Sequence, residues 1–396
     1  MEKDFLKLSD NEISIITPEN KTYNEPMRGY YPATYGFEND IISHNPSGWQ
    51  VNENSPTYDF EIVKEKNSHK YVVRIKDNEL GGYRMQYYPD SDIEIGTIEL
   101  WVLGANVSDK SLEISSLDNS SITGITLLLH TDGWYYYGDY GDQLISNTSI
   151  PQDNKWHHIR LDFRCSGAVE YMGLTESSYR VYIDGMNLGD LSFCEPYFDK
   201  LNSFIIATDN LSDSEWWVDA IGFSWDPNYN IGDNLNEGLL LSFDNSTTLD
   251  WMAYSLDGLT NKTILGNTTI PMPLNGSHTI QVFGNDSLGI IHASDIRYFS
   301  INVPQPYIPP NNSLIIILSV AIGVFIAVFG IILVVILIRK KRYETYKSEE
   351  PKKPEIRVKP KSGYLICPYC HNDNFIQNNY CIHCGASLLE FKPDNL

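Results

Sequence analysis

Residues 30–229 alternate apolar and polar positions, and Gly, Asn, Asp and Pro interrupt the pattern every few residues. Alternation with a period of two is typical of β-strands with one buried face. The clearest examples are residues 71–75 (YVVRI), 97–102 (TIELWV), 125–129 (ITLLL) and 179–183 (YRVYI). We therefore expect a mainly β fold, in which many short strands form an antiparallel sandwich.

Residues 239–303 contain a second set of alternating segments, which are separated from the first by a short polar stretch. The segments are residues 251–258 (WMAYSLDG), 276–287 (GSHTIQVFGNDS) and 296–301 (IRYFSI). Their order resembles the later strands of Ig-like repeats in archaeal and bacterial exported proteins. The opening strands of that pattern are missing between 239 and 303. We therefore expect a truncated Ig-like module that packs on the first domain and acts as a spacer.

Residues 314–338 form an apolar run of 25 residues without a charge, and the basic cluster 339–342 (RKKR) follows directly. As a helix this run is about 37 Å long, enough to cross a hydrocarbon core of about 30 Å with some tilt. The sequence therefore predicts one transmembrane helix. Within it, the small residues Ser319, Gly323 and Ala327 recur every four positions, a spacing that permits a homodimer through the helix.

The flanks of the predicted span set its orientation. Basic residues lie on its C-terminal side, which places the C-terminus in the cytoplasm. Eleven Asn-x-Ser/Thr sequons precede the end of the stalk and none lies beyond the span, as expected of a glycoprotein with its N-terminal part outside. The segment 304–313 is Pro-rich and reads as an extended stalk, and 339–362 reads as a charged cytoplasmic linker.

The N-terminal segment 1–29 mixes charges through its first ten residues and has no apolar stretch of seven or more. It therefore contains no recognisable secretory signal. We expect that a signal peptide is missing from this sequence. The alternative is a fully intracellular protein held on an internal membrane.

The chain has 29 Lys+Arg and 51 Asp+Glu, and residues 1–338 hold 18 and 44 of these, a formal charge of −26. So acidic an N-terminal part repels nucleic acid, which excludes that class of partner for it. The remaining classes are recognition, catalysis and structure.

Four motifs within residues 30–229 resemble concanavalin A-like, laminin G-type jelly rolls. In chain order they are residues 96–102 (GTIELWV), 155–163 (KWHHIRLDF), 181–185 (VYIDG) and 217–223 (WVDAIGF). The resemblance implies binding of carbohydrate or protein, calcium-dependent in some members, and glycan hydrolysis in a few. On the residues themselves, Asp184-Gly185 predicts a hairpin turn.

Two segments of this region are candidates for chemistry. Sandwich hydrolases carry Glu-x-Asp-x-Glu, whereas here Asp90, Asp92 and Glu94 begin with a shorter Asp after Pro89, so we expect a solvated turn and no enzyme. In residues 132–142 (DGWYYYGDYGD), the rings of Trp134, Tyr136 and Tyr140 are either a glycan-binding patch or a hairpin whose alternate rings enter the core. Asp132, Asp139 and Asp142 are oxygen donors suited to calcium.

The six cysteines fall into two groups. Cys165 and Cys194 are either a disulfide, with a loop of about 30 residues, or two buried thiols. Cys367, Cys370, Cys381 and Cys384 form two C-x-x-C knuckles separated by ten residues, which is a zinc-ligand spacing. Residues 363–390 thus resemble the zinc ribbons of many prokaryotic membrane and regulatory proteins. Attachment of haem through the C-x-x-C-H pattern would leave the second knuckle unused. A redox dithiol would require a surrounding βαβ pattern, which this part of the sequence lacks.

Together these features predict a single-pass cell-surface protein that resembles archaeal single-pass surface proteins. Its expected role is recognition or adhesion, with an outer lectin-like domain that binds glycan or protein. Its cytoplasmic zinc ribbon, with structural zinc, is expected to bind a protein partner. The alternatives are a membrane-anchored glycan hydrolase of the same fold and a purely structural envelope protein.

Overall fold

The computed structural model describes residues 12–52, 60–77, 84–105, 112–118, 121–130, 132–138, 141–146, 148, 150–208, 214–304 and 364–389. The chain divides into two compact units, Met1–Gln305 and Pro306–Leu396, each described by itself here. Among the residues described, no helix is long and apolar enough to cross a bilayer. The predicted span at 314–338 and the predicted linker at 339–362 lie outside the described residues.

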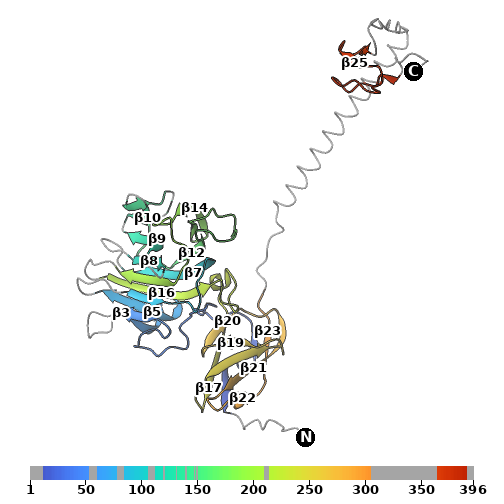
Figure 1. The fold of residues 1–396 in the computed structure, drawn as a ribbon. Helices are drawn as coiled ribbons and strands as arrows, with labels where there is room; N and C mark the ends of the chain where they lie inside the picture. Colours follow the sequence, from blue (N-terminus) through green and yellow to red (C-terminus); the bar gives the residue numbers. More distant parts are fainter. Residues whose placement is uncertain are drawn as a thin grey trace, which may run out of the picture. The chain divides into compact units, whose positions relative to one another are not determined.

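The first unit contains a large sandwich of two antiparallel sheets, which confirms the predicted β fold (Figure 1). Its described residues form two seven-stranded sheets. In order across the first sheet the strands are β11 (Gly141–Leu144), β10 (Gly133–Gly138), β9 (Thr123–His130), β8 (Leu112–Leu117), β15 (Ser203–Thr208), β6 (Arg84–Tyr87) and β3 (Gln50–Asn52). Across the second they are β14 (Met186–Ser192), β13 (Ser178–Ile183), β12 (His157–Arg164), β7 (Ile95–Gly104), β16 (Ser214–Phe223), β5 (His69–Asp77) and β4 (Phe60–Lys66).

The core between the two sheets follows from the alternation in the sequence. Ile98 and Leu100 of β7 and Ile159 and Leu161 of β12 are fully buried in one apolar cluster. Their neighbours along each strand face the other side, because successive side chains of a strand point to opposite faces. Between β13 and β14, Asp184 and Gly185 both have positive φ, 50° and 78°, as the predicted hairpin turn requires.

The rest of the first unit is a small module with two sheets. One has the order β1 (Ile13–Thr17), β17 (Leu239–Asn245) and β20 (Thr268–Ile270). The other has the order β19 (Lys262–Ile264), β18 (Trp251–Leu256), β21 (Gly276–Asn285), β23 (Arg297–Ile301) and β2 (Thr22–Tyr23), with β22 (Ile291–Ala293) paired to β21.

The structure corrects the prediction that this module lacks its opening strands. The N-terminal segment supplies them: β1 pairs antiparallel with β17, and β2 pairs parallel with β23. Figure 1 shows the blue N-terminal segment lying among the yellow and orange strands. Residues 1–29 are therefore partly structural elements of the small module, and the large sandwich is inserted between β2 and β17.

The two connections between the module and the inserted sandwich pair with each other. The backbone NH of Met27 donates to the carbonyl of Gly238 at 2.9 Å, and the NH of Gly238 donates to the carbonyl of Tyr30 at 2.8 Å. The NH of Gly29 donates to the Glu237 carboxylate at 2.7 Å. Gly238 is needed here, because a Cβ would lie 2.3 Å from the carbonyl oxygen of Ile270.

The N-terminal strand gives a stability test with an internal control. Ile15 is 4% exposed in the small core, whereas its neighbour Ile16 is 51% exposed. We expect Ile15→Ala to lower the free energy of unfolding of the small module by about 2–5 kcal/mol, because it leaves a cavity. Ile16→Ala should cost less than about 1 kcal/mol. Urea denaturation, with hydrogen exchange measured at β17, checks this. Equal effects of the two substitutions would contradict the placement of β1.

Candidate metal centre and outer-domain sites

The second unit contains a small two-stranded hairpin with four cysteines beside it. β24 (Tyr364–Ile366) pairs with β25 (Asp373–Phe375). Each C-x-x-C segment then turns on itself: the NH of His371 donates to the carbonyl of Cys367 at 2.9 Å, and the NH of Gly385 donates to that of Cys381 at 2.8 Å. Gly385 has a φ of 73°, a left-handed conformation that glycine adopts without strain, so it suits the second turn.

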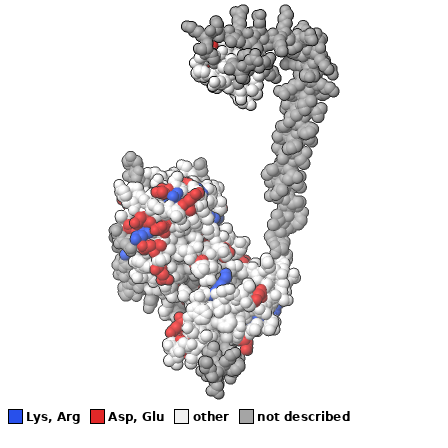
Figure 2. Space-filling model, turned by 45° about the vertical axis from the view of Figure 1, so that its right-hand side comes forward, with Lys and Arg blue, Asp and Glu red and all other residues white. Residues whose placement is uncertain are grey.

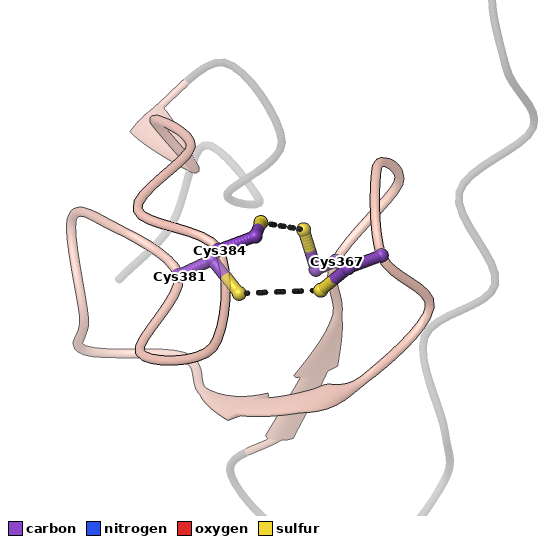
Figure 3. A group of neighbouring side chains, drawn as sticks. Cys367, Cys381 and Cys384 are labelled. Carbon is purple, nitrogen blue, oxygen red and sulfur yellow. Dashed lines mark hydrogen bonds between the residues drawn. The ribbon is translucent and has the colours of Figure 1, made fainter.

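The four thiols converge on one point (Figure 3). The Sγ atoms of Cys367, Cys370, Cys381 and Cys384 all lie within 4.8 Å of one another. The Sγ of Cys367 is 3.7 Å from that of Cys384, and the Sγ of Cys370 is 3.5 Å from that of Cys381. Sulfurs at the corners of a tetrahedron with metal–sulfur bonds of about 2.3 Å are about 3.8 Å apart. The residues therefore fit a tetrahedral metal ion.

Hydrogen bonds around Cys381 favour its charged, metal-binding form. The side-chain amide of the buried Asn374 donates to the Sγ of Cys381 at 3.3 Å and accepts from the NH of Ile382 at 2.9 Å. Loss of hydration opposes ionisation of Cys381, but backbone NH groups directed at its sulfur outweigh it and lower its pKa. Asn374 was not identified from the sequence, since nothing in its spacing marks it as a partner of a ligand.

The two histidines of this segment lie apart from the thiol cluster, whereas two leucines pack against it. His371 and His383 are exposed and lie outside the group of four thiols. Leu365 and Leu388 are fully buried beside Cys367 and Cys381, and form the small apolar cluster of the segment. A core of this size is too small to fold the segment alone, so a bound metal is the expected source of its folding energy.

The predicted aromatic patch in residues 132–142 does not have its tryptophan on the surface. Trp134 of β10 is fully buried in the core and packs edge-on against His157. Its ring faces the opposite sheet, so it is unavailable to a glycan. Tyr136 is half-buried and donates to the side chain of Gln143 at 2.6 Å, and Tyr140 lies outside the described residues.

The acidic residues of the same segment do not form a cation site in the part of the chain that the structure describes. Asp132 accepts a hydrogen bond from the Tyr135 hydroxyl at 3.0 Å, and Asp142 lies in β11. Asp139 is outside the described residues. Among described side chains, the group of four cysteines is the one cluster suited to a metal ion.

Cys165 and Cys194 are separate thiols in the structure, so the disulfide alternative is not formed. Cys165 is fully buried in the large core, where burial raises its pKa well above the usual range. A thiol with so high a pKa is inert as a nucleophile. Of the two interpretations of this pair, the structure matches two thiols that are not bonded to each other, although Cys194 is only half-buried.

The Asp90–Glu94 segment is a turn that leads into β7, as expected. Asp90, Asp92 and Glu94 are all exposed. Asp92 forms an ion pair with Lys200 at 2.8 Å, which lowers its pKa. The trio does not lie along one strand face, where period-two spacing would bring carboxylates together.

A buried polar cluster lies on the outward face of β7, β12 and β16. Glu99 accepts hydrogen bonds from the hydroxyl of Tyr229 at 2.7 Å and from the NH of Gly232 at 2.6 Å. The side chain of Asn234 contacts His158 at 2.9 Å and donates to the carbonyl of Ala220 at 2.8 Å. Residues 229–234 therefore cover this face and satisfy its polar groups.

A His–Asp pair extends this cluster. The Nδ1 of His69 lies 2.7 Å from the Oδ2 of Asp219, and the imidazole stacks between the rings of Tyr31 and Trp156. Burial lowers the pKa of His69 to about 3 and raises that of Asp219 well above its usual range. Burial of the pair therefore favours the uncharged form of each group. The sequence signal for this polar cluster is the row of polar residues at alternate positions of β7 and β12, for which the sequence alone predicted no site.

A cavity of about 790 Å³ lies between loops of the large sandwich and the edge of the small module. Its wall consists of residues from segments 33–48, 87–93, 223–228 and 263–268. Tyr35, Tyr87 and Trp225 contribute partly exposed aromatic rings to it. Ligand sites in proteins usually have volumes of this order. No short motif predicts this cavity, because its wall comes from four separate stretches of chain.

Among the carboxyl groups of this wall, Glu38 has the pKa that is shifted furthest from its ordinary value. Burial raises its pKa to about 8, although the Thr269 hydroxyl donates a hydrogen bond to it at 2.5 Å and opposes the rise. Thr269 lies in β20, an edge strand of the small module. Glu38 therefore joins the two parts of the first unit as an uncharged acid.

Comparisons with known proteins are consistent with the sandwich fold and do not identify a family or a function. No protein-family model matches the chain, and no curated protein matches it. Among solved structures it is similar to a sialidase, with 14% identity, a TM-score of 0.35, 46% of this chain covered and 17% of that chain. It is also similar to the carbohydrate binding module CBM66 from Bacillus subtilis, with 10% identity, a TM-score of 0.31, 44% of this chain covered and 94% of that chain. A Bacillus licheniformis beta-glucanase is similar with 12% identity, a TM-score of 0.31, 49% of this chain covered and 96% of that chain.

These neighbours are jelly-roll sandwich proteins with names from both carbohydrate binding and glycan cleavage. The chain spans less than a fifth of the sialidase. At such identities and TM-scores the likeness does not decide function, which has to be argued from the residues.

We expect metal and fold to be lost together at the four-cysteine site. Cys381→Ser should abolish metal binding by the full chain and unfold residues 364–389, because metal binding supplies their folding energy. His383→Ala, two residues away and exposed, should leave both unchanged. Native mass spectrometry for metal content and NMR for the fold check this. A chain that keeps a dispersed spectrum for these residues after chelation would contradict the assignment.

Glu38 should give the first unit a measurable pH dependence. Its folded pKa of about 8 exceeds the usual 4.5, so its contribution to stability is complete below pH 4.5 and declines as the pH rises to about 8. Glu38→Gln removes this loss. The free energy of unfolding of the variant, relative to that of the unchanged protein, should therefore increase by up to about 1.4 kcal/mol per pH unit over that range. Urea denaturation at several pH values measures the difference. The exposed Glu94→Gln is the control, and curves that stay parallel for Glu38→Gln refute a protonated Glu38.

Proposed function

We propose that this chain is a single-pass cell-surface protein of recognition or adhesion. Its first unit lies outside the cell and binds a glycan or a protein. The apolar run 314–338 crosses the membrane, and the four-cysteine segment 364–389 lies in the cytoplasm, where it holds one structural zinc ion and binds a protein partner. The four thiolates fill the tetrahedral coordination shell of zinc and leave no open position for catalysis.

The observation that carries this proposal is the division of the chain at the apolar run. The two compact units are Met1–Gln305 and Pro306–Leu396, and the run with its basic flank lies close behind the boundary. The reactive thiol cluster belongs to the second unit. All sequons whose asparagine the structure describes belong to the first, and those at Asn20, Asn245, Asn261 and Asn275 are exposed. Reduced thiolates suit the cytoplasm and sequons suit the exterior.

The surface charge supports the same assignment. Figure 2 shows that acidic side chains outnumber basic ones on the visible face of the first unit. An acidic, soluble surface suits an exposed domain that does not approach nucleic acid. Self-association through Ser319, Gly323 and Ala327 stays a prediction, because these residues lie outside the described part of the chain.

We propose binding without turnover for the first unit. Retaining glycosidases need two carboxyl groups about 5–5.5 Å apart beside the substrate. The Asp90–Glu94 trio lies in an exposed turn, and residues 229–234 cover Glu99 on the outward face of the sheet. This arrangement favours a recognition domain over the alternative of a glycan hydrolase.

Protease protection tests the proposed topology. Protease added to intact cells should digest the chain before residue 312 and leave the tail protected, because only the first unit is accessible. Antibodies against residues 364–389 and against the large sandwich report the two fragments. Cells permeabilised with detergent are the control, in which the tail should also become accessible. Protection of the first unit with cleavage of the tail in intact cells would reverse the orientation.

A further inference from the structure

The cavity of the first unit has a wall that is aromatic on one side and polar on the other. The ring of Phe223 stacks on Trp225 with centroids 4.6 Å apart and on Tyr87 at 4.9 Å. Tyr35 meets Tyr87 edge-on at 5.3 Å. The stack fixes the rings, so they lose little freedom when a ligand packs on them. Ser47, Asn228 and Thr263, which carry hydroxyl and amide groups, also line the cavity.

The charges of the wall restrict what it can hold. No Lys, Arg or His is among its residues, whereas four carboxyl groups are: Glu38, Asp40, Asp90 and Asp226. An anionic ligand such as a uronate or a sulfated sugar would meet uncompensated negative charge. Repulsion of this kind is an effective means of rejecting a ligand.

Three of the four carboxyl groups already have protein partners. Glu38 accepts from Thr269, Asp40 accepts from the NH of Ser47 at 3.2 Å and from its hydroxyl, and Asp226 accepts from the NH of Asn228 at 2.9 Å. Asp90 is exposed at the rim, and no hydrogen bond joins it to another described side chain. The wall therefore offers few charges that need a cation and many groups that suit hydroxyls.

We propose that this cavity binds an uncharged saccharide, stacked on the partly exposed rings of Tyr87 and Trp225, which the buried ring of Phe223 supports, and held at the rim by Asp90. Sugars present an apolar ring face to aromatic side chains and hydroxyls to carboxylates. The inference rests on the proposed recognition function and names the ligand class and the site. Because Leu265 of the small module also lines the cavity, the site needs both parts of the first unit.

Calorimetric titration of the full chain, in a detergent without a sugar headgroup, tests this. The probes are neutral tetrasaccharides of glucose, galactose or mannose, uronate tetrasaccharides of matched length, and the amino-sugar tetrasaccharide of chitosan. We expect a neutral probe to bind at least tenfold more tightly than the charged ones. Ser91→Trp, at an exposed position of the wall, should fill the cavity and weaken binding at least tenfold. Asp90→Ala should weaken it about tenfold.

Glu94→Gln is the matched control, because Glu94 is exposed four positions from Asp90 and does not line the cavity. It should leave the affinity within about twofold. A neutral probe that binds Ser91→Trp as tightly as the unchanged protein would overturn the site and leave the proposed function standing. Equal or tighter binding of a charged probe would overturn the ligand class. If no tetrasaccharide binds while cells carrying the chain still adhere to a protein-coated surface, the inference fails and the recognition function remains.

Discussion

The first unit depends on backbone pairing between two distant stretches of chain. Met27, Gly238 and Tyr30 hydrogen-bond at the point where the chain leaves the small module and where it returns. An inserted domain must have its two ends close together, and this pairing holds them side by side. The cavity and the contact of Glu38 with Thr269 both exist because the module edge is held against the loops of residues 33–48.

The same return path closes the outward face of one sheet. Residues 229–234 lie over β7 and β12 just before the chain re-enters the module at β17, so Tyr229 and Asn234 can satisfy Glu99 and His158. A buried ionisable group without a partner costs several kcal/mol, and hydrogen-bonding partners reduce that cost. The polar residues of this face are therefore compatible with burial only because the connection lies on them.

The sequence predicted what depends on neighbours along the chain. Residues 97–102 and 179–183 alternate at most positions and are strands, and the spacing of Cys367, Cys370, Cys381 and Cys384 brought four thiols together. It did not predict what depends on distant pairing. Thr22–Tyr23 is too short to carry a pattern, and its partner β23 is nearly 280 residues away. Trp134 lies in an aromatic run whose composition suits either a core or a surface, and only the strand register decides between them.

The order of strands in the small module determines how it bears tension. Lys262–Ile264, beside the cavity, and Arg297–Ile301, after which the chain leaves the module, belong to the same sheet, with β18 and β21 between them. A pull between a molecule in the cavity and the C-terminal side of the module therefore loads the antiparallel hydrogen bonds of these strands. Because the ladder bonds of β18 with β21 and of β21 with β23 run across several residue pairs each, the load is shared among many bonds. Because Tyr87, Asp90 and Trp225 of the inserted sandwich also line the cavity, part of this load enters the module through the paired connections at Met27, Tyr30 and Gly238.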